Sequence, residues 1–169
     1  MQRKRPVRLL YTAEERHRRD ASPWTTVQAV LAPLQFGAFL ASLFFILRYL
    51  RTGDGLEVAT ASVVLKTLFL YAIMVTGSLW EKAVFGRYLF ARPFFWEDVV
   101  SMLVIALHTS YLYALVSGAV APRHQMYLAL AAYASYVVNA TQFLIKLRTA
   151  KKQPSEAGAD ASAGLRFSQ

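Results

Sequence analysis

Four side chains in this sequence are of the types that carry out acid–base chemistry, and three of them lie in one apolar stretch. Glu97 and Asp98 open the apolar stretch FFWEDVVSMLVIALHTSYLYAL, His108 lies in its middle, and Glu81 ends an earlier apolar stretch. Carboxyl groups in close contact favour keeping one of them protonated, and a carboxylate or an imidazole can accept a proton from water. These four residues are the candidate catalytic residues.

Each of these residues also has an ordinary structural interpretation. Glu97 and Asp98 can serve as capping or helix-dipole residues at a helix N-terminus. His108 can bond a backbone carbonyl inside a bundle, although ionisable groups within a membrane are costly and favour a functional role. Lys66 can extend toward the membrane surface or pair with Glu57.

The composition excludes several other chemistries. The 169 residues contain no cysteine, so thiolate nucleophiles, iron–sulfur clusters and Cys-ligated zinc are excluded. The three histidines form no i, i+4 pair, and the P-loop, the dinucleotide-binding glycine motif and the ExxH pairs of di-iron bundles are absent. The net charge of +9 comes from basic residues that flank apolar stretches, which argues against nucleic acid as a partner.

The elements that must position these residues are four apolar helices. Hydrophobic residues make up 56% of the chain and the mean hydropathy is +0.32, values typical of an integral membrane protein. Four stretches exceed the ~20 residues that cross a bilayer, where only helices and closed barrels satisfy their own backbone. The sequence therefore predicts an all-α integral membrane bundle of four transmembrane helices. The predicted spans are residues 24–50, 56–82, 96–120 and 125–148.

The chain outside this four-helix domain of residues 24–148 is basic or polar. Residues 1–23 form a basic N-terminal arm, and residues 149–169 form a polar tail that we expect to be disordered. Seven of the 19 Lys and Arg residues precede residue 24 and five lie from Lys146 onward, which places both termini in the cytoplasm. The acidic candidates then lie near the cytoplasmic boundary, and His108 lies deeper.

A second set of polar and aromatic side chains has the depth and chemistry to bind a lipophilic substrate. Some of them have alternative roles, since Asn139 and Gln142 can form hydrogen bonds between helices and Trp96 can belong to an interfacial aromatic belt. The candidate substrate-binding residues are Lys82, Arg87, Trp96, Ser101, Tyr111, Tyr136, Asn139 and Gln142.

Three long stretches of this chain resemble one family of enzymes. They are LYTAEERHRRDASPWTTVQAVLAPLQF, TASVVLKTLFLYAIMVTGSLWEKAVFGRYLFARPFFWEDVVSMLVIALHTSYL and MYLALAAYASYVVNATQFLIKLR, within residues 10–148. They are similar to the 3-vinyl bacteriochlorophyllide hydratases of phototrophic bacteria. The resemblance implies hydration of the 3-vinyl group of chlorophyllide a, or of a bacteriochlorophyllide, to a 3-(1-hydroxyethyl) group in bacteriochlorophyll biosynthesis. It also implies a multi-pass protein of the bacterial inner membrane, either cytoplasmic or intracytoplasmic photosynthetic.

The resemblance also implies the molecules that this chain meets. They are a chlorophyllide-type magnesium tetrapyrrole, water and membrane lipid, with other enzymes of pigment biosynthesis as further candidate partners. We expect no cofactor, because acid-catalysed addition of water needs none and the substrate carries its own magnesium. Lys82 and Arg87 are candidates to pair with the propionate of the substrate.

His108 is a candidate axial ligand of the substrate magnesium, since histidine commonly ligates tetrapyrrole metals. It follows Glu97 by eleven residues, or roughly 16 Å along a helix axis, which exceeds the distance from the magnesium to the vinyl group. The two residues therefore cannot easily serve both ends of one substrate. Two other functions stay open, namely a non-catalytic tetrapyrrole carrier or assembly protein and a small transporter or proton-coupled channel.

Overall fold

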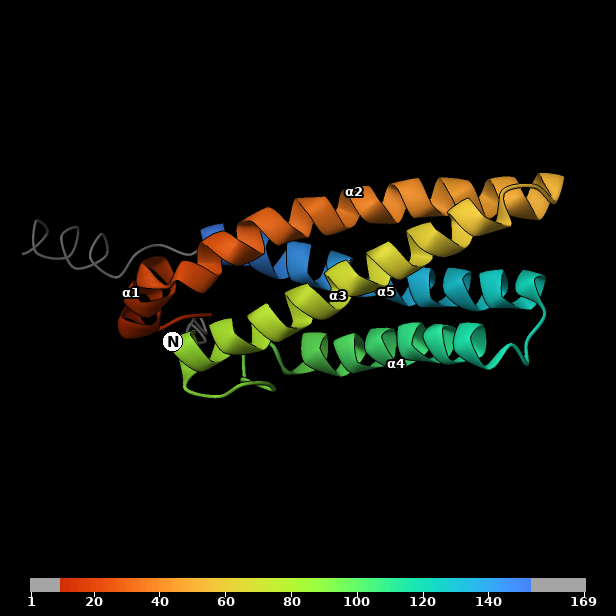
Figure 1. Cartoon of the computed structure of the whole chain (residues 1–169). Coiled ribbons are helices and arrows are strands. Elements are labelled where there is room, and N and C mark those ends of the chain that lie inside the picture. Colours follow the sequence, from red (N-terminus) through yellow and green to blue (C-terminus); the bar gives the residue numbers. More distant parts are fainter. Residues whose placement is uncertain (1–9, 153–169) are drawn as a thin grey trace, which may run out of the picture.

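The computed structural model describes residues 10–152, which fold into five helices and no strand (Figure 1). Helices α2 to α5 are long and apolar enough to cross a membrane. This part of the chain therefore confirms the predicted all-α fold with four candidate spans. The helices are α1 (Ala13–Ala21), α2 (Pro23–Thr52), α3 (Leu56–Phe85), α4 (Phe95–Ser117) and α5 (Pro122–Lys152).

Helix α1 forms inside residues 1–23, the predicted basic N-terminal arm. The Glu15 amide donates to the Thr12 hydroxyl over 3.2 Å, and the Thr12 amide donates to the Glu15 carboxylate over 2.8 Å. This reciprocal pair is a capping box, which satisfies two amides that a helix start otherwise leaves unpaired. At the other end of the chain α5 continues to Lys152, so the first residues of the predicted tail are helical. The rest of that tail lies outside the described residues.

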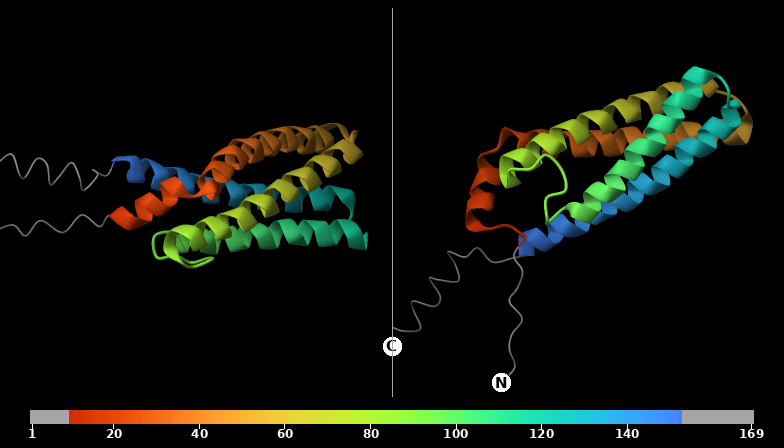
Figure 2. Two further views of the ribbon diagram at one scale, coloured as in Figure 1. Left: turned by 60° about the vertical axis from the view of Figure 1, so that its left-hand side comes forward. Right: turned by 90° about the horizontal axis from the view of Figure 1, so that it is seen from below.

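The four long helices form two antiparallel pairs that cross each other (Figures 1 and 2). Helix α2 packs mainly on α3, and α4 packs mainly on α5. Helix α3 ends where Gly86 adopts a φ of 77°, a left-handed conformation that favours glycine, and its amide donates to the Lys82 carbonyl. The chain then forms the loop 86–94 before α4. This loop and α1 lie at the same end of the bundle, opposite the α2–α3 and α4–α5 turns.

A polar network in the bundle interior connects the two helix pairs. Lys66 of α3 and His108 of α4 are fully buried, and the Lys66 Nζ lies 2.8 Å from the His108 Nε2. The Tyr133 hydroxyl of α5 donates to the Ser42 Oγ of α2 over 2.6 Å. Apolar side chains such as Ile46 and Met126 surround these contacts. All four long helices thus contribute hydrogen bonds to one interior, which fixes the pairs against each other.

Candidate functional site

The end of α3 and the start of α4 bring two carboxyl groups together. Glu81 and Asp98 are 4% and 3% exposed, and their carboxyl groups are in hydrogen-bonding contact. Two carboxyl groups can share a hydrogen bond only when one of them carries a proton. The predicted contact between the end of one span and the start of the next therefore forms, and it forms a pair that can hold a transferable proton.

The same two carboxyl groups also hold the loop 86–94. The Phe90 amide donates to the Asp98 Oδ2 over 2.7 Å, and the Ala91 amide donates to the Glu81 Oε2 over 3.2 Å. Phe90 has a φ of 59°, a left-handed conformation that costs a bulky residue about 1–3 kcal/mol and persists only where its surroundings enforce it. The loop therefore depends on the carboxyl pair for its shape.

Glu97 has a different partner from its neighbour Asp98. Its Oε2 accepts from the Lys146 Nζ of α5 over 2.7 Å, and the two side chains are 9% and 23% exposed. Lys146 also donates to the carbonyl of Pro93, and its ammonium lies 5.2 Å from the centre of the Phe94 ring. An ion pair of this kind requires an ionised Glu97. The cluster therefore combines a carboxyl pair that holds a proton with a carboxylate that does not.

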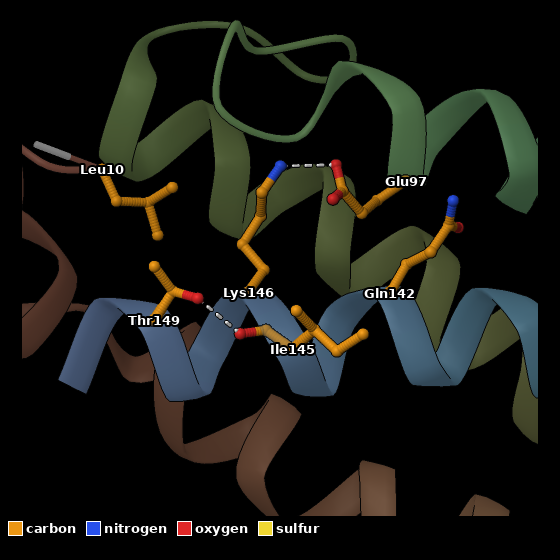
Figure 3. A pocket seen from close by; sticks show the side chains of 6 residues that line it. All are labelled: Leu10, Glu97, Gln142, Ile145, Lys146 and Thr149. Atoms are coloured by element: carbon orange, nitrogen blue, oxygen red, sulfur yellow. Dashed lines mark hydrogen bonds and ion pairs between the residues drawn. The ribbon is translucent and has the colours of Figure 1, made fainter. Parts of the chain in front are cut away.

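Glu97 lines a pocket of about 260 Å³ between α4, α5 and the chain before α1 (Figure 3). Gln142 and Lys146 rise from α5 toward α4, and Leu10 faces them from the N-terminal side. The Oε1 of Gln142 is buried and has no hydrogen-bond partner within residues 10–152. A buried acceptor without a donor costs about 1–3 kcal/mol. The pocket is lined by Leu10, Glu97, Gln142, Ile145, Lys146 and Thr149.

The residue that follows Leu10 fixes the N-terminal wall of this pocket. Tyr11 is 3% exposed and stacks on the Phe85 ring with centroids 5.8 Å apart. The Arg19 guanidinium of α1 lies 5.0 Å from the centre of the Tyr11 ring. Burial raises the pKa of Tyr11 to about 12, although Arg19 opposes the shift, so the phenol stays neutral. Tyr11 therefore anchors the segment that places Leu10 against the pocket.

The candidate residues Ser101 and Asn139 join α4 to α5 about one helical turn from the pocket residues Glu97 and Gln142. The amide nitrogen of Asn139 donates to the backbone carbonyl of Glu97 over 2.9 Å and to the Ser101 Oγ over 3.0 Å. The Ser101 hydroxyl in turn donates to the Glu97 carbonyl over 2.8 Å. These are the interhelical hydrogen bonds that we weighed for Asn139, and they fix the backbone that carries the Glu97 side chain.

Three candidate substrate-binding residues lie outside the pocket. The Lys82 ammonium donates to the Gly86 carbonyl over 3.0 Å and lies 5.1 Å from the centre of the Tyr88 ring. Arg87 is exposed on the loop, and Trp96 is 69% exposed on α4. None of the three lines the pocket that contains Glu97. Their position fits contacts with a membrane surface or with a remote part of a large substrate.

His108, Tyr111 and Tyr136 belong to the bundle interior and not to the pocket. The His108 Nδ1 donates to the Val104 carbonyl over 2.8 Å, which leaves the Nε2 lone pair facing the Lys66 Nζ. Both ring nitrogens are therefore engaged, and the role of His108 as a magnesium ligand stays a prediction that requires Lys66 to move. The fully buried Tyr111 lies in the same core.

The interpretation of Lys66 as a side chain that extends to the surface or pairs with Glu57 is wrong. Lys66 is fully buried, and its ammonium lies 4.2 Å from the centre of the Tyr136 ring and 5.2 Å from that of Tyr133. The aromatic faces and the His108 nitrogen replace water around the lysine, which offsets part of the cost of burial.

The residues missing from our candidate set are Lys146 and the pocket walls. Gln142 and Lys146 are spaced as i, i+4, and Asn139 precedes Gln142 by three residues, so all three share one face of α5. That spacing is the signal that could have identified Lys146. No comparable pattern identifies Leu10, because only the fold of the chain before α1 brings it to α5. The remaining walls are Ile145 and Thr149.

Four candidate membrane spans, together with a proton-holding carboxyl pair next to an ionised carboxylate, are the features of a membrane-embedded acid–base enzyme. Residues 11–149 match the family described as 2-vinyl bacteriochlorophyllide hydratase. The chain belongs to this family.

Two relatives carry the same description. The 2-vinyl bacteriochlorophyllide hydratase of Rhodobacter capsulatus is 65% identical over 144 residues, which cover 85% of this chain and 84% of the relative. That of Cereibacter sphaeroides is 62% identical over 147 residues, which cover 86% and 91%. No solved structure matches this chain significantly. The match begins at Tyr11 and ends at Thr149, so it includes the whole pocket apart from Leu10.

Proposed function

We propose that this chain is the hydratase that adds water to the ring A vinyl group of chlorophyllide a in bacteriochlorophyll biosynthesis. The vinyl group and one water give a 1-hydroxyethyl group, with one proton going to the terminal carbon and the hydroxyl to the adjacent carbon. Membership of the family supports the reaction. Four residues would carry out the reaction, namely Glu81, Glu97, Asp98 and Lys146, and we call them the carboxylate cluster.

The Glu81–Asp98 pair is the proton donor in this proposal. Protonation of the terminal vinyl carbon leaves a positive charge on the adjacent carbon, which the conjugated macrocycle delocalises. A carboxyl group is acidic enough for this step, and a shared hydrogen bond keeps one proton on the pair at neutral pH. The backbone amides of Phe90 and Ala91 stabilise the pair after the proton has left, because they donate to both carboxyl groups.

Glu97 is the base in this proposal. It forms an ion pair with Lys146, and among residues 10–152 it is the only carboxylate that lines the pocket. A carboxylate in this position can accept the proton of water as the oxygen attacks the cationic carbon. The neighbouring Lys146 cannot bind the substrate propionate at the same time, because the vinyl group and the propionate are carried by different rings of the macrocycle.

The observation that carries the proposal is that neighbouring carboxyl groups of one cluster have different partners. Asp98 and Glu97 are adjacent in sequence, yet one shares a proton with Glu81 and the other is paired with an ammonium group. Hydration needs one protonated and one ionised group near the same carbon–carbon double bond. A carrier of intact pigment needs neither, which makes the enzyme the better interpretation of this geometry.

The topology follows from the charges around the pocket. Three arginines of α1, together with Lys146 and Arg148 of α5, lie at the same end of the bundle as the pocket. The positive-inside rule places this end in the cytoplasm, with both termini. The substrate then enters from the inner leaflet of the bacterial inner or intracytoplasmic photosynthetic membrane, and the exposed Lys82 and Arg87 are available to its propionate.

The test is a reaction of membranes containing this chain with chlorophyllide a, without nucleotide, reductant or added metal. We expect the pigment to gain the mass of one water, because acid–base addition needs no cofactor. Membranes without the chain are the control. Pigment that binds the membranes but stays unchanged would support the carrier, and pigment that gains water only after a nucleotide or reductant is added would contradict the mechanism.

A further inference from the structure

Three exposed aromatic side chains form a row that begins on the loop 86–94 and continues onto α4. Phe90, Phe95 and Trp96 are 38%, 44% and 69% exposed. The ring centroids of Phe90 and Phe95 are 5.7 Å apart, and those of Phe95 and Trp96 are 5.5 Å apart. We call these three residues the aromatic row. Its members contact one another and still leave apolar surface open to an outside molecule.

The aromatic row begins beside the proposed proton donor. The Phe90 amide donates to the Asp98 Oδ2 over 2.7 Å. The Phe90 side chain branches from the atom next to that amide nitrogen, so a molecule that touches the Asp98 carboxyl also lies within reach of the Phe90 ring. The last member of the row, Trp96, directly precedes Glu97 in α4. The row is therefore continuous with the carboxylate cluster.

An interfacial aromatic belt accounts for Trp96 but not for Phe90. Such belts are enriched in Trp and Tyr, which combine an apolar ring with a polar group, and phenylalanine has no polar group. Phe90 also has a φ of 59°, which glycine adopts freely and a bulky residue adopts only under strain. Backbone strain of this kind clusters at ligand clamps and active sites. A ring at a position that suits glycine better indicates that the ring itself is used.

The charges beside the aromatic row define the chemistry of its occupant. Lys82, Arg87 and Arg92 are exposed at the end of α3 and on the loop, and none of them forms an ion pair within residues 10–152. A chlorophyllide combines a flat conjugated body, which can pack on aromatic rings, with a propionate that can pair with an exposed cation. A lipid acyl chain has neither property.

We infer that the aromatic row binds the macrocycle of the substrate, with Phe90 nearest to the reacting vinyl group, an inference that rests on the proposed hydratase function. The macrocycle keeps its contact with the rings before and during the addition of water. Contacts of equal strength in the ground state and the transition state contribute affinity and leave the chemical step unchanged. The row therefore acts on KM, whereas the carboxylate cluster acts on kcat.

The experiment compares Phe95→Leu, Trp96→Leu and Phe90→Gly with Tyr113→Leu in the full-length chain. Leucine keeps an apolar side chain without the ring, and glycine removes the ring together with the backbone strain. Tyr113 is likewise an aromatic residue of α4 and is 75% exposed, but it lies near the other end of that helix, which makes it the matched control. The dissociation constant is measured from the absorption shift of chlorophyllide a on purified protein, and KM, kcat and the midpoint of thermal unfolding are measured beside it.

Phe95→Leu and Trp96→Leu should each raise the dissociation constant and KM by about 2- to 10-fold, the value of one aromatic contact, with kcat within about twofold of the wild type. Phe90→Gly should weaken binding to a similar extent without lowering the midpoint of thermal unfolding, because glycine adopts the same φ without strain. Tyr113→Leu should leave binding, KM and kcat unchanged.

Variants of the aromatic row that bind chlorophyllide a as tightly as Tyr113→Leu would overturn the inference and leave the row as part of an interfacial belt. Weaker binding that is accompanied in every row variant by a lower midpoint of thermal unfolding would also overturn it, because the row would then be structural. A wild type that binds the pigment without hydrating it, while the row variants bind it more weakly, would reject the proposed function and retain the row.

Discussion

The protein buries ionisable side chains in two regions, and the two regions differ in charge balance and access. The carboxylate cluster contains Glu81, Glu97 and Asp98 with Lys146, and a pocket opens beside it. The interior network contains Lys66 and His108, which are fully buried and have no carboxylate partner in the described part of the chain. Cost alone does not distinguish the two regions, because ionisable groups are expensive in both.

The difference shows that burial of an ionisable group inside a membrane protein has two distinct uses. In the interior, Lys66 and His108 belong to different helix pairs, so their contact adds to the Tyr133–Ser42 hydrogen bond that joins the pairs. In the carboxylate cluster, the Glu81–Asp98 pair lies next to Glu97, which lines a pocket. We therefore assign chemistry to the cluster and cohesion of the bundle to the interior network.

The largest effect is expected from Glu97→Gln. Glutamine keeps the size of the side chain and removes the base, so kcat should fall by about 10²- to 10⁴-fold while tetrapyrrole binding persists. Turnover per mole of membrane-inserted protein and pigment binding are the measurements. Unchanged turnover would remove the basis for assigning chemistry to the carboxylate cluster.

Asp98→Asn should reduce turnover by about 10²-fold, toward the lower end of the range for a lost acid. The asparagine oxygen can still accept the Phe90 amide, so the loop 86–94 should keep its shape while the shared proton is lost. Limited proteolysis at the loop separates the two effects. A variant with intact turnover would show that the Glu81–Asp98 pair supports the loop and nothing else.

Lys146→Met should act mainly on stability. It leaves the partly buried Glu97 without its ion-pair partner, and an unsatisfied group of this kind costs about 1–3 kcal/mol in free energy of unfolding. Combining Lys146→Met with Glu97→Gln should restore part of the thermal stability in detergent, because no unpaired charge then remains. Additive losses in the double variant would mean that the ion pair contributes little.

The smallest effect on turnover is expected from Lys66→Met. Methionine fills the same volume, and kcat should stay within about threefold of the wild type, as for changes away from a reacting centre. The midpoint of thermal unfolding should fall, because the His108 Nε2 loses its donor. A large loss of turnover with unchanged stability would move the chemistry to the interior and reverse the comparison.

The sequence was sufficient to predict the four spans because each is longer than a bilayer and bounded by glycine, proline or charge. It was also sufficient to bring Glu81 near Glu97 and Asp98, since a short loop connects two successive helices. The partners of these residues could not be predicted in the same way. Hydropathy defines depth but not the rotation of a helix, so Lys146 facing Glu97 and Lys66 facing His108 depend on how the two pairs cross.

The N-terminal wall of the pocket shows a second limit of prediction from the sequence. The Thr12–Glu15 capping box is a local pattern, and it predicts α1 once it is recognised. The burial of Tyr11 depends instead on Phe85 and Phe94, which are more than seventy residues away in the chain. Contacts of that range leave no local pattern, so a basic arm and a pocket wall cannot be distinguished from the sequence.

The most direct test of the account measures incorporation of ¹⁸O-labelled water into chlorophyllide a by two variants side by side, Glu97→Gln and Lys66→Met. Each amount is normalised to the protein present in the membrane. We predict that Lys66→Met incorporates label at nearly the wild-type rate and that Glu97→Gln incorporates almost none while still binding pigment. Incorporation by Glu97→Gln and its loss in Lys66→Met would contradict the assignment of the chemistry to the carboxylate cluster.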